Sequence, residues 1–222
     1  MTDRRQVLVI GAGRFGTSVA TELERMGHEV LVVDRDAAVI EAVADQVTHA
    51  VVGDATDADT LRELGVADFD VVVVAIGVDE RSSILTTVQL KRAGAKFVLV
   101  KADTELLGDI LSMVGADRIV YPELDTGTRT AHNLTMLEAL DYFDVGPGYG
   151  VARFSGRPFA GRTLGELDLP GRYGLTPIFL KRGDRFVVNP APSERIGPTD
   201  ELTLAGPDPE LERLAIAQPK DG

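Results

Sequence analysis

The first two thirds of the chain alternate short apolar runs with amphipathic stretches. The apolar runs are rich in β-branched residues and have the length of buried strands; they cover residues 7–10, 30–33, 50–52, 71–76, 97–100 and 119–121. The stretches between them repeat apolar residues at helical spacing and cover residues 15–26, 37–45, 58–64, 82–92, 105–114 and 126–140. This alternation predicts a Rossmann-like, doubly wound α/β domain, in which helices cover both faces of a parallel sheet.

The last part of the chain has a different pattern. Short apolar runs at 151–154, 175–180, 186–188 and 201–204 predict strands, and residues 209–217 predict a closing helix. This arrangement indicates a small α+β domain.

Charge and proline content both change near residue 145. Residues 1–144 contain 25 acidic and 13 basic side chains, whereas residues 145–222 contain 10 of each. Pro122 is the single proline before Pro147, and frequent prolines are typical of short strands joined by turns. The sequence Gly-Pro-Gly-Tyr-Gly at 146–150 indicates a linker or a tight turn. We therefore expect a first domain over residues 1–145 and a second over residues 146–222.

Composition narrows the possible functions. The 222 residues include no cysteine, which excludes disulfides, thiolate metal sites and cysteine nucleophiles. The net charge of −12 argues against nucleic acid as a partner, because such proteins must neutralise phosphates. No apolar run approaches the roughly 20 residues of a membrane-spanning helix, and the first residues do not resemble a signal peptide. We expect a soluble, cytoplasmic, acidic protein.

A glycine-rich loop directly follows the first predicted strand and opens the first helix. In the sequence Gly-Ala-Gly-Arg-Phe-Gly, Gly11 permits a tight turn, Gly13 lets the backbone approach a pyrophosphate, and Gly16 lets the helix pack closely on the strand. Asp34 ends the second strand, where a carboxylate binds a ribose hydroxyl and repels a 2′-phosphate. This context predicts a nucleotide site; the alternative is a degenerate Rossmann domain that binds nothing.

Three cations lie near this predicted site. Arg14, inside the loop with Phe15, can donate paired hydrogen bonds to a further phosphate, or it is a solvated cation of the first helical turn. Arg35, next to Asp34, would attract a 2′-phosphate, but we still expect Asp34 to disfavour one. Lys101 ends the fifth strand at the edge where open α/β sheets bind ligands, so it faces a phosphate or extends along the surface.

Small residues end the third and fourth strands beside the same crevice. They leave room for an adenine and its ribose, although turn chemistry alone also explains them; they are Asp54, Ala55, Thr56, Ala75, Ile76 and Gly77.

Catalytic groups are scarce. The three histidines, His28, His49 and His132, lie at a helix end, before a strand and within a helix, and the predicted second domain has none. No Tyr stands four residues before a Lys, and no hydrolase, metalloprotease or P-loop motif is present. A nucleotide site without catalytic groups indicates a sensor rather than an enzyme. The alternatives are a small NAD-dependent oxidoreductase and an NADH redox sensor that uses the same site.

Several motifs, taken in order, resemble the RCK domains (regulators of potassium conductance), in particular the cytosolic subunits of the Ktr and TrkA potassium uptake systems. The motifs are the glycine loop, Met26-Gly-His-Glu-Val30, Gly53-Asp-Ala-Thr56, Ala75-Ile-Gly77, Leu85-Thr-Thr87, Val100-Lys-Ala102, Gly115-Ala-Asp-Arg118 and Tyr121-Pro-Glu123, followed by Tyr173-Gly174, Pro190-Ala-Pro192 and Asp200-Glu-Leu202 through Gly206. The resemblance covers nearly the whole chain after residue 5.

The resemblance implies a ring of subunits at the inner face of the plasma membrane. Such subunits pair through a crossover helix, here residues 126–140, assemble into an octamer under a membrane potassium-translocating subunit, and bind ATP, ADP or NAD(H) without consuming it. It implies that Gly11, Gly13 and Gly16 hold phosphate, and that Arg14 reaches a γ-phosphate. It also implies that Asp34 holds the ribose and that Asp54 and Ala55 flank the adenine.

Two further ligands follow from the resemblance alone. Glu123 matches a carboxylate that helps to place a divalent cation, Mg²⁺ or Ca²⁺, near the phosphates; its other interpretation is a turn residue after Pro122. Some relatives bind cyclic di-AMP in the second domain, where residues 172–178 are the candidates here.

Overall fold

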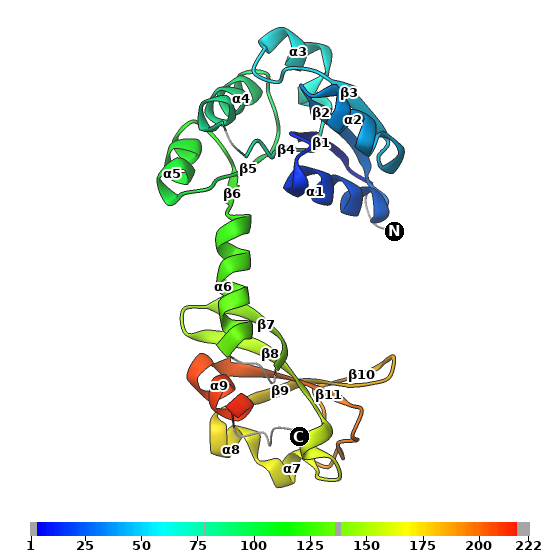
Figure 1. Ribbon diagram of the computed structural model, residues 1–222, viewed down its shortest axis with the longest axis vertical. Helices are drawn as coiled ribbons and strands as arrows, with labels where there is room; N and C mark the ends of the chain where they lie inside the picture. The colour runs from blue at the N-terminus through cyan, green and yellow to red at the C-terminus, as the bar shows by residue number, and fades with distance from the viewer. Residues whose placement is uncertain (1–3, 78, 136–138, 217–222) are drawn as a thin grey trace. The chain divides into compact units, whose positions relative to one another are not determined.

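The computed structural model describes residues 4–77, 79–135 and 139–216. The chain divides into two compact units, Met1–Leu124 and Asp125–Gly222 (Figure 1). Each unit has its own hydrophobic core, so each is described by itself.

The first unit is built on a parallel six-stranded sheet in the order β3-β2-β1-β4-β5-β6. The strands are β1 (Gln6–Ile10), β2 (Glu29–Asp34), β3 (His49–Val52), β4 (Val71–Val74), β5 (Val98–Lys101) and β6 (Arg118–Val120). The strand order reverses between β1 and β4, and open sheets of this kind bind ligands at such a reversal. The predicted Rossmann-like sheet is confirmed.

Helices cover both faces of this sheet. They are α1 (Arg14–Arg25), α2 (Ala37–Val43), α3 (Ala58–Glu63), α4 (Glu80–Arg92) and α5 (Glu105–Met113), with the short 3₁₀ turns η1 (Ala44–Gln46) and η2 (Val66–Asp68). Alternate residues of β1 point to opposite faces: Val7 and Val9 pack in the core that includes residues of α1 and α2, and Leu8 packs in the core that includes residues of α3, α4 and α5. Because both faces of the sheet are covered here, the central strands β1 and β4 are apolar over nearly their whole length.

The next helix, α6 (Pro122–Thr135), differs from the predicted helix 126–140 at both ends. It begins earlier, at a proline whose fixed φ suits a first helical position. Ala139 and Leu140 already belong to a strand, and residues 136–138 lie outside the described part of the chain. The apolar spacing of this segment fits the end of a helix and the start of a strand equally well, so its pattern did not separate the two.

The second unit contains an antiparallel five-stranded sheet in the order β10-β9-β11-β8-β7. Its strands are β7 (Ala139–Gly146), β8 (Tyr149–Ser155), β9 (Thr176–Arg182), β10 (Arg185–Val188) and β11 (Glu201–Pro207). Its helices are the 3₁₀ turn η3 (Arg157–Phe159), α7 (Leu164–Leu167), α8 (Leu169–Tyr173) and α9 (Asp208–Ile216). The predicted α+β domain is confirmed; Ala217 of the predicted closing helix lies outside the described residues.

The chain enters the second sheet at Ala139, ahead of the boundary that composition predicted at residue 146. Strand β7 pairs with β8 in antiparallel register, so residues 146–150 contain the turn of a hairpin rather than a linker. Tyr142 is the single fully buried side chain of β7, and acidic residues flank the strand's exposed positions. Strand β7 is therefore acidic in composition, like the first domain, although it folds with the second.

Candidate nucleotide site

The glycine loop is held tightly between three strands. Gly11 has a φ of +96°, a left-handed conformation that favours glycine, and its N–H donates to the Val33 carbonyl at 2.8 Å. A β-carbon on Gly11 would lie 3.0 Å from the backbone carbonyl of Ala75. The loop thus lies where β1, β2 and β4 end together, as the sequence predicted.

The other two loop glycines serve different purposes. A β-carbon on Gly16 would lie 1.9 Å from the Gly11 carbonyl oxygen, so α1 could not pack on the loop with any side chain there. Gly13, the N-cap of α1, is exposed, and a β-carbon on it would meet no atom within 4 Å. Its absent side chain leaves open the space in front of the helix N-terminus.

The N-terminus of α1 is also the one left without a side-chain cap among α1 to α5. In the other four helices a side chain accepts a hydrogen bond from a first-turn N–H, through Asp36, Asp57, Asp79 and Thr104. Gly13 offers no such acceptor. The free N–H groups and the positive end of the helix dipole are therefore available to an anion, and the geometry fits a phosphate.

Asp34 lies at the end of β2, opposite the loop. One carboxylate oxygen accepts from the Ala12 N–H at 2.7 Å, and the other accepts from the Asp36 N–H at 2.9 Å. These bonds orient the carboxylate and connect it to the glycine loop. A ribose hydroxyl would meet an acceptor whose position is already fixed.

A cleft of about 320 Å³ brings most of the predicted residues together. Its walls include Gly11, Gly13, Asp34, Arg35, Asp54, Ala55, Thr56, Ala75, Ile76 and Gly77. These residues come from the ends of β1, β2, β3 and β4, so the structure brings them together in one crevice.

Four predicted residues lie outside the cleft walls. Arg14 is exposed at the start of α1, Phe15 is half-buried beside it, and Gly16 is buried beneath the loop. Lys101 is buried and forms ion pairs with Asp103 and with Glu123, the latter at 3.1 Å. Residues adjacent in sequence to a loop glycine need not face the cleft, because α1 turns them away from it.

Sequence reasoning missed several residues of the cleft. Asp79 and Ser82 reach it from the start of α4, and Asp36 and Val39 reach it from α2. The signal for Asp79 is an Asp-x-x-Ser pattern ahead of a helix: Asp79 accepts hydrogen bonds from the N–H and the hydroxyl of Ser82. That pattern predicts a helix cap but not which cavity the cap faces.

The cleft is acidic. The pKa of Asp54 lies below its ordinary value, chiefly because the Thr56 hydroxyl and N–H donate to it, with a further contribution from Arg35. The pKa of Asp79 is lowered in the same way, first by the Ser82 hydroxyl and then by its N–H. Carboxylates that stay ionised suit the hydroxyl and amino donors of a nucleoside and repel phosphate. The phosphates are therefore expected near the glycine loop and not against the carboxylates of Asp54 and Asp79.

Glu123, the predicted cation ligand, pairs with the ammonium of Lys101. Among residues 4–77, 79–135 and 139–216, no group of three or more histidine, aspartate or glutamate side chains is arranged to hold a metal ion. A divalent cation at Glu123 therefore stays a prediction.

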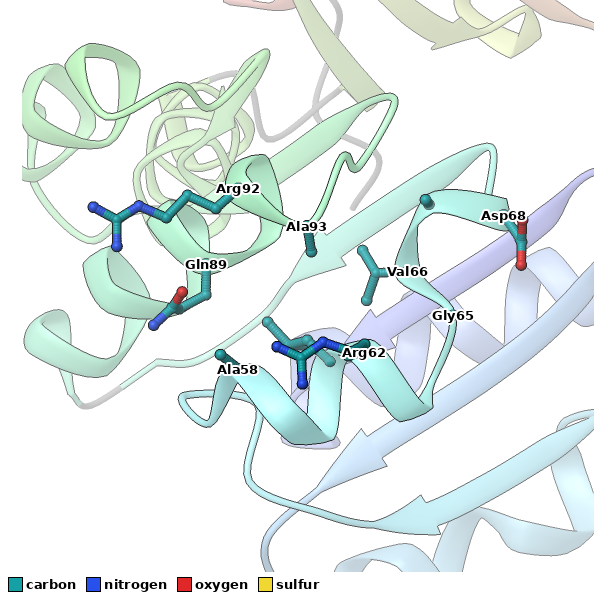
Figure 2. Close-up of a pocket in the computed structure, with 10 residues that line it drawn as sticks. Ala58, Arg62, Gly65, Val66, Asp68, Gln89, Arg92 and Ala93 are labelled. Carbon is teal, nitrogen blue, oxygen red and sulfur yellow. The ribbon is translucent and has the colours of Figure 1, made fainter.

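A larger hollow, of about 410 Å³, lies away from the glycine loop. Figure 2 shows Arg62 from α3 and Gln89 and Arg92 from α4 at its walls. It lies toward the C-terminal end of α4, whereas Ser82 near the start of α4 lines the cleft. Arg62 forms an ion pair with Asp59, and the walls contain no glycine-rich loop that opens an α-helix. This hollow lacks the features that bind a nucleotide.

None of the helices in the described ranges is long and apolar enough to cross a lipid bilayer.

Comparison with protein families gives two matches. The TrkA-N domain model matches residues 7–122, and the TrkA-C domain model matches residues 153–215. The Ktr system potassium uptake protein C of Bacillus subtilis is 37% identical over 95% of this chain and 96% of its own length. The Ktr system potassium uptake protein A of Vibrio alginolyticus is 36% identical over 95% of this chain and 96% of its own length.

Solved structures agree with the fold. The crystal structure of the GsuK RCK domain superposes with a TM-score of 0.64 at 20% identity, covering 100% of this chain and 49% of that chain. A GsuK channel bound to NAD gives a TM-score of 0.63 at 22% identity, covering 99% and 41%. This chain spans about half the length of those channel chains, and at such identities the likeness establishes the fold alone.

Proposed function

Because this chain belongs to the family of potassium uptake proteins built from a TrkA-N and a TrkA-C domain, we propose that it regulates a membrane potassium transporter in response to an adenine nucleotide. The resemblance to RCK-domain subunits is thereby confirmed. The relatives matched over nearly their full length are potassium uptake proteins and not enzymes, which also confirms the prediction of a role without catalysis.

The observation that carries the proposal is the cleft itself. An uncapped helix N-terminus, an open space in front of Gly13 and an oriented Asp34 carboxylate lie within one crevice at the reversal of the strand order. Together they provide for phosphate at one end and for ribose at the other. We assign phosphate to the loop N–H groups, ribose to Asp34, and adenine to the space between Asp54 and Ala55.

The ligand is proposed among ATP, ADP and NAD(H). A fold neighbour, the GsuK channel, has been solved bound to NAD. The acidic walls disfavour a 2′-phosphate, so we expect NADP(H) to bind more weakly than NAD(H). Arg14, exposed next to the uncapped terminus, is proposed to reach a γ-phosphate from its own chain or from a neighbouring subunit.

Regulation is proposed to act through assembly. The subunits would pair through α6 and form an octameric ring at the cytoplasmic face of a membrane potassium-translocating partner. A ligand that binds one ring shape more tightly than another shifts the population of shapes, typically by 1–3 kcal/mol of coupling per site. Several sites in one ring would add their effects.

Cyclic di-AMP at residues 172–178 is a second proposed effector.

Calorimetric titration tests the proposal. ATP, ADP, NAD and NADH are titrated into the purified protein, with and without Mg²⁺ or Ca²⁺, and then in competition with one another. We expect one of them to bind without turnover, and a preference for NADH over NAD would favour the redox-sensor alternative. Absence of binding by all four, or steady consumption of one with a carbonyl substrate, would contradict a regulatory site.

A further inference from the structure

Lys101 connects the wall of the cleft to the first turn of α6. Its side chain is 7% exposed, and its ammonium pairs with Asp103 and, at 3.1 Å, with Glu123. The same ammonium lies near Gly77, a cleft residue: a β-carbon on Gly77 would lie 3.7 Å from Lys101 Nζ. Glu123 is the second residue of α6. One buried charge therefore adjoins both the cleft and the helix that leads into the second unit.

The two carboxylates stabilise the charged form of this ammonium. Burial is the largest single influence and lowers the pKa of Lys101, but hydrogen bonds and attraction from Asp103 and Glu123 outweigh it and leave the pKa raised. The carboxylates themselves are much more exposed than the ammonium, at 43% and 69%. Glu123 can therefore leave for solvent at little cost, whereas Lys101 must keep anionic partners.

A phosphate in the cleft would be such a partner. Gly77 has no side chain to separate the ammonium from the cleft, and a lysine ammonium has three donors that can be shared between anions. Phosphate oxygens beside Gly77 would compete with Glu123 for this charge. The released Glu123 would remain favourable in the first turn of α6, where the helix dipole stabilises a carboxylate.

We propose that Lys101 is a positioning residue that couples occupancy of the cleft to α6: phosphate draws the ammonium toward Gly77 and releases Glu123 from it. This coupling rests on the proposed nucleotide site. It differs from a simple ligand role, because the Lys101–Glu123 ion pair stabilises the nucleotide-free state. Breaking this ion pair favours the nucleotide-bound state.

Glu123→Gln gives the sharpest test. If Glu123 competes with phosphate for Lys101, bound nucleotide weakens the Lys101–Glu123 ion pair. By linkage, a mutation that weakens this ion pair must tighten nucleotide binding by the same factor. In calorimetry with EDTA present, which excludes any divalent cation, we expect Glu123→Gln to bind nucleotide roughly five-fold more tightly than the unmodified chain. Unchanged or weaker binding would overturn the coupling.

Hydrogen–deuterium exchange of the full-length protein reports on α6 directly. Nucleotide is expected to raise exchange in peptides that cover residues 120–132 of the unmodified chain. In Lys101→Met, exchange there should be high with and without nucleotide, while nucleotide still binds within about ten-fold of its normal affinity. Loss of all binding by a folded Lys101→Met would make Lys101 a phosphate ligand and overturn the positioning role.

Lys91→Met is the matched control. Lys91 also pairs with a carboxylate, Asp117 at 3.0 Å, but it does not line the cleft. This variant should keep both the affinity and the exchange response. If the unmodified chain binds no nucleotide in the calorimeter, the proposed function fails; if it binds nucleotide and exchange in α6 stays constant, only the coupling fails.

Discussion

At the scale of single residues, Gly13 and Gly16 differ in what a side chain there would meet. Gly16 has no room for a β-carbon because the Gly11 carbonyl oxygen occupies the place. Gly13 has room for a β-carbon, and its φ of −66° suits any residue. The absence of a side chain there leaves the space in front of the α1 N-terminus open. Gly16 therefore serves packing, and Gly13 is proposed to serve a ligand.

This contrast can be measured with two alanine variants. Gly16→Ala should lower the free energy of unfolding by about 1–3 kcal/mol, because the loop and α1 must move apart. Gly13→Ala should unfold within about 1 kcal/mol of the unmodified chain, since alanine is only a poorer N-cap, yet it should lose most nucleotide affinity. Urea denaturation and calorimetry read out the two effects. Equal loss of stability in both variants would show that Gly13 is also structural.

Arg14 is proposed to distinguish ATP from ADP. If its guanidinium reaches only a third phosphate, Arg14→Ala should weaken ATP by about ten-fold or more and leave ADP nearly unchanged, because charge-assisted bonds to phosphate are strong. Arg25→Ala, at the other end of α1 where Arg25 pairs with Glu22, is the control and should change neither affinity. An equal loss for both nucleotides would show that Arg14 does not sense the γ-phosphate.

At the scale of elements, the second sheet depends on a buried carboxylate at the start of β11. Asp200 accepts two hydrogen bonds from the Arg182 Nε and Nη2 groups of β9 and one from the Gly197 N–H. These bonds, led by those of Arg182, hold the pKa of Asp200 below its ordinary value. The aspartate thereby joins β9, β11 and the loop between β10 and β11.

The stabilisation that Asp200 provides depends on pH. Because the folded-state pKa is the lower one, the stabilisation is fully present above the unfolded-state pKa of about 3.9 and is lost as the pH falls through the folded-state value. At pH 7 we expect Asp200→Asn to lower the free energy of unfolding by about 1–3 kcal/mol, and the difference should shrink when urea denaturation is repeated near pH 3. Asp184→Asn, on the exposed turn between β9 and β10, should show no difference at either pH.

At the scale of the whole molecule, the proposed regulation requires assembly. A single chain of 23.8 kDa offers one cleft and one α6, and only a ring can add the bias of several sites. Native mass spectrometry or light scattering should give about 190 kDa, eight times the chain mass, if the proposed octamer forms. A monomer at micromolar concentration would contradict the ring.

Local patterns determined much of this protein. Apolar runs located every strand of the first sheet. The central strands β1 and β4 gave clear runs because strands buried on both faces are apolar over nearly their whole length. The glycine loop, with Asp34 one strand later, located the crevice, because these glycines are required by backbone geometry that neighbouring residues set. The family resemblance rests on the same local motifs.

Long-range pairing decided the rest. Strand β7 joined the second sheet because Tyr142 is buried there and donates to Asp208, 66 residues further along the chain. Lys101 pairs with Glu123, and Asp79 lines the cleft, because the parallel sheet brings the ends of distant strands to one edge. A pattern of hydrophobic and polar positions specifies which face of an element is buried, but not which charged groups of other elements will lie beside it. That depends on register and packing, which the folded chain alone fixes.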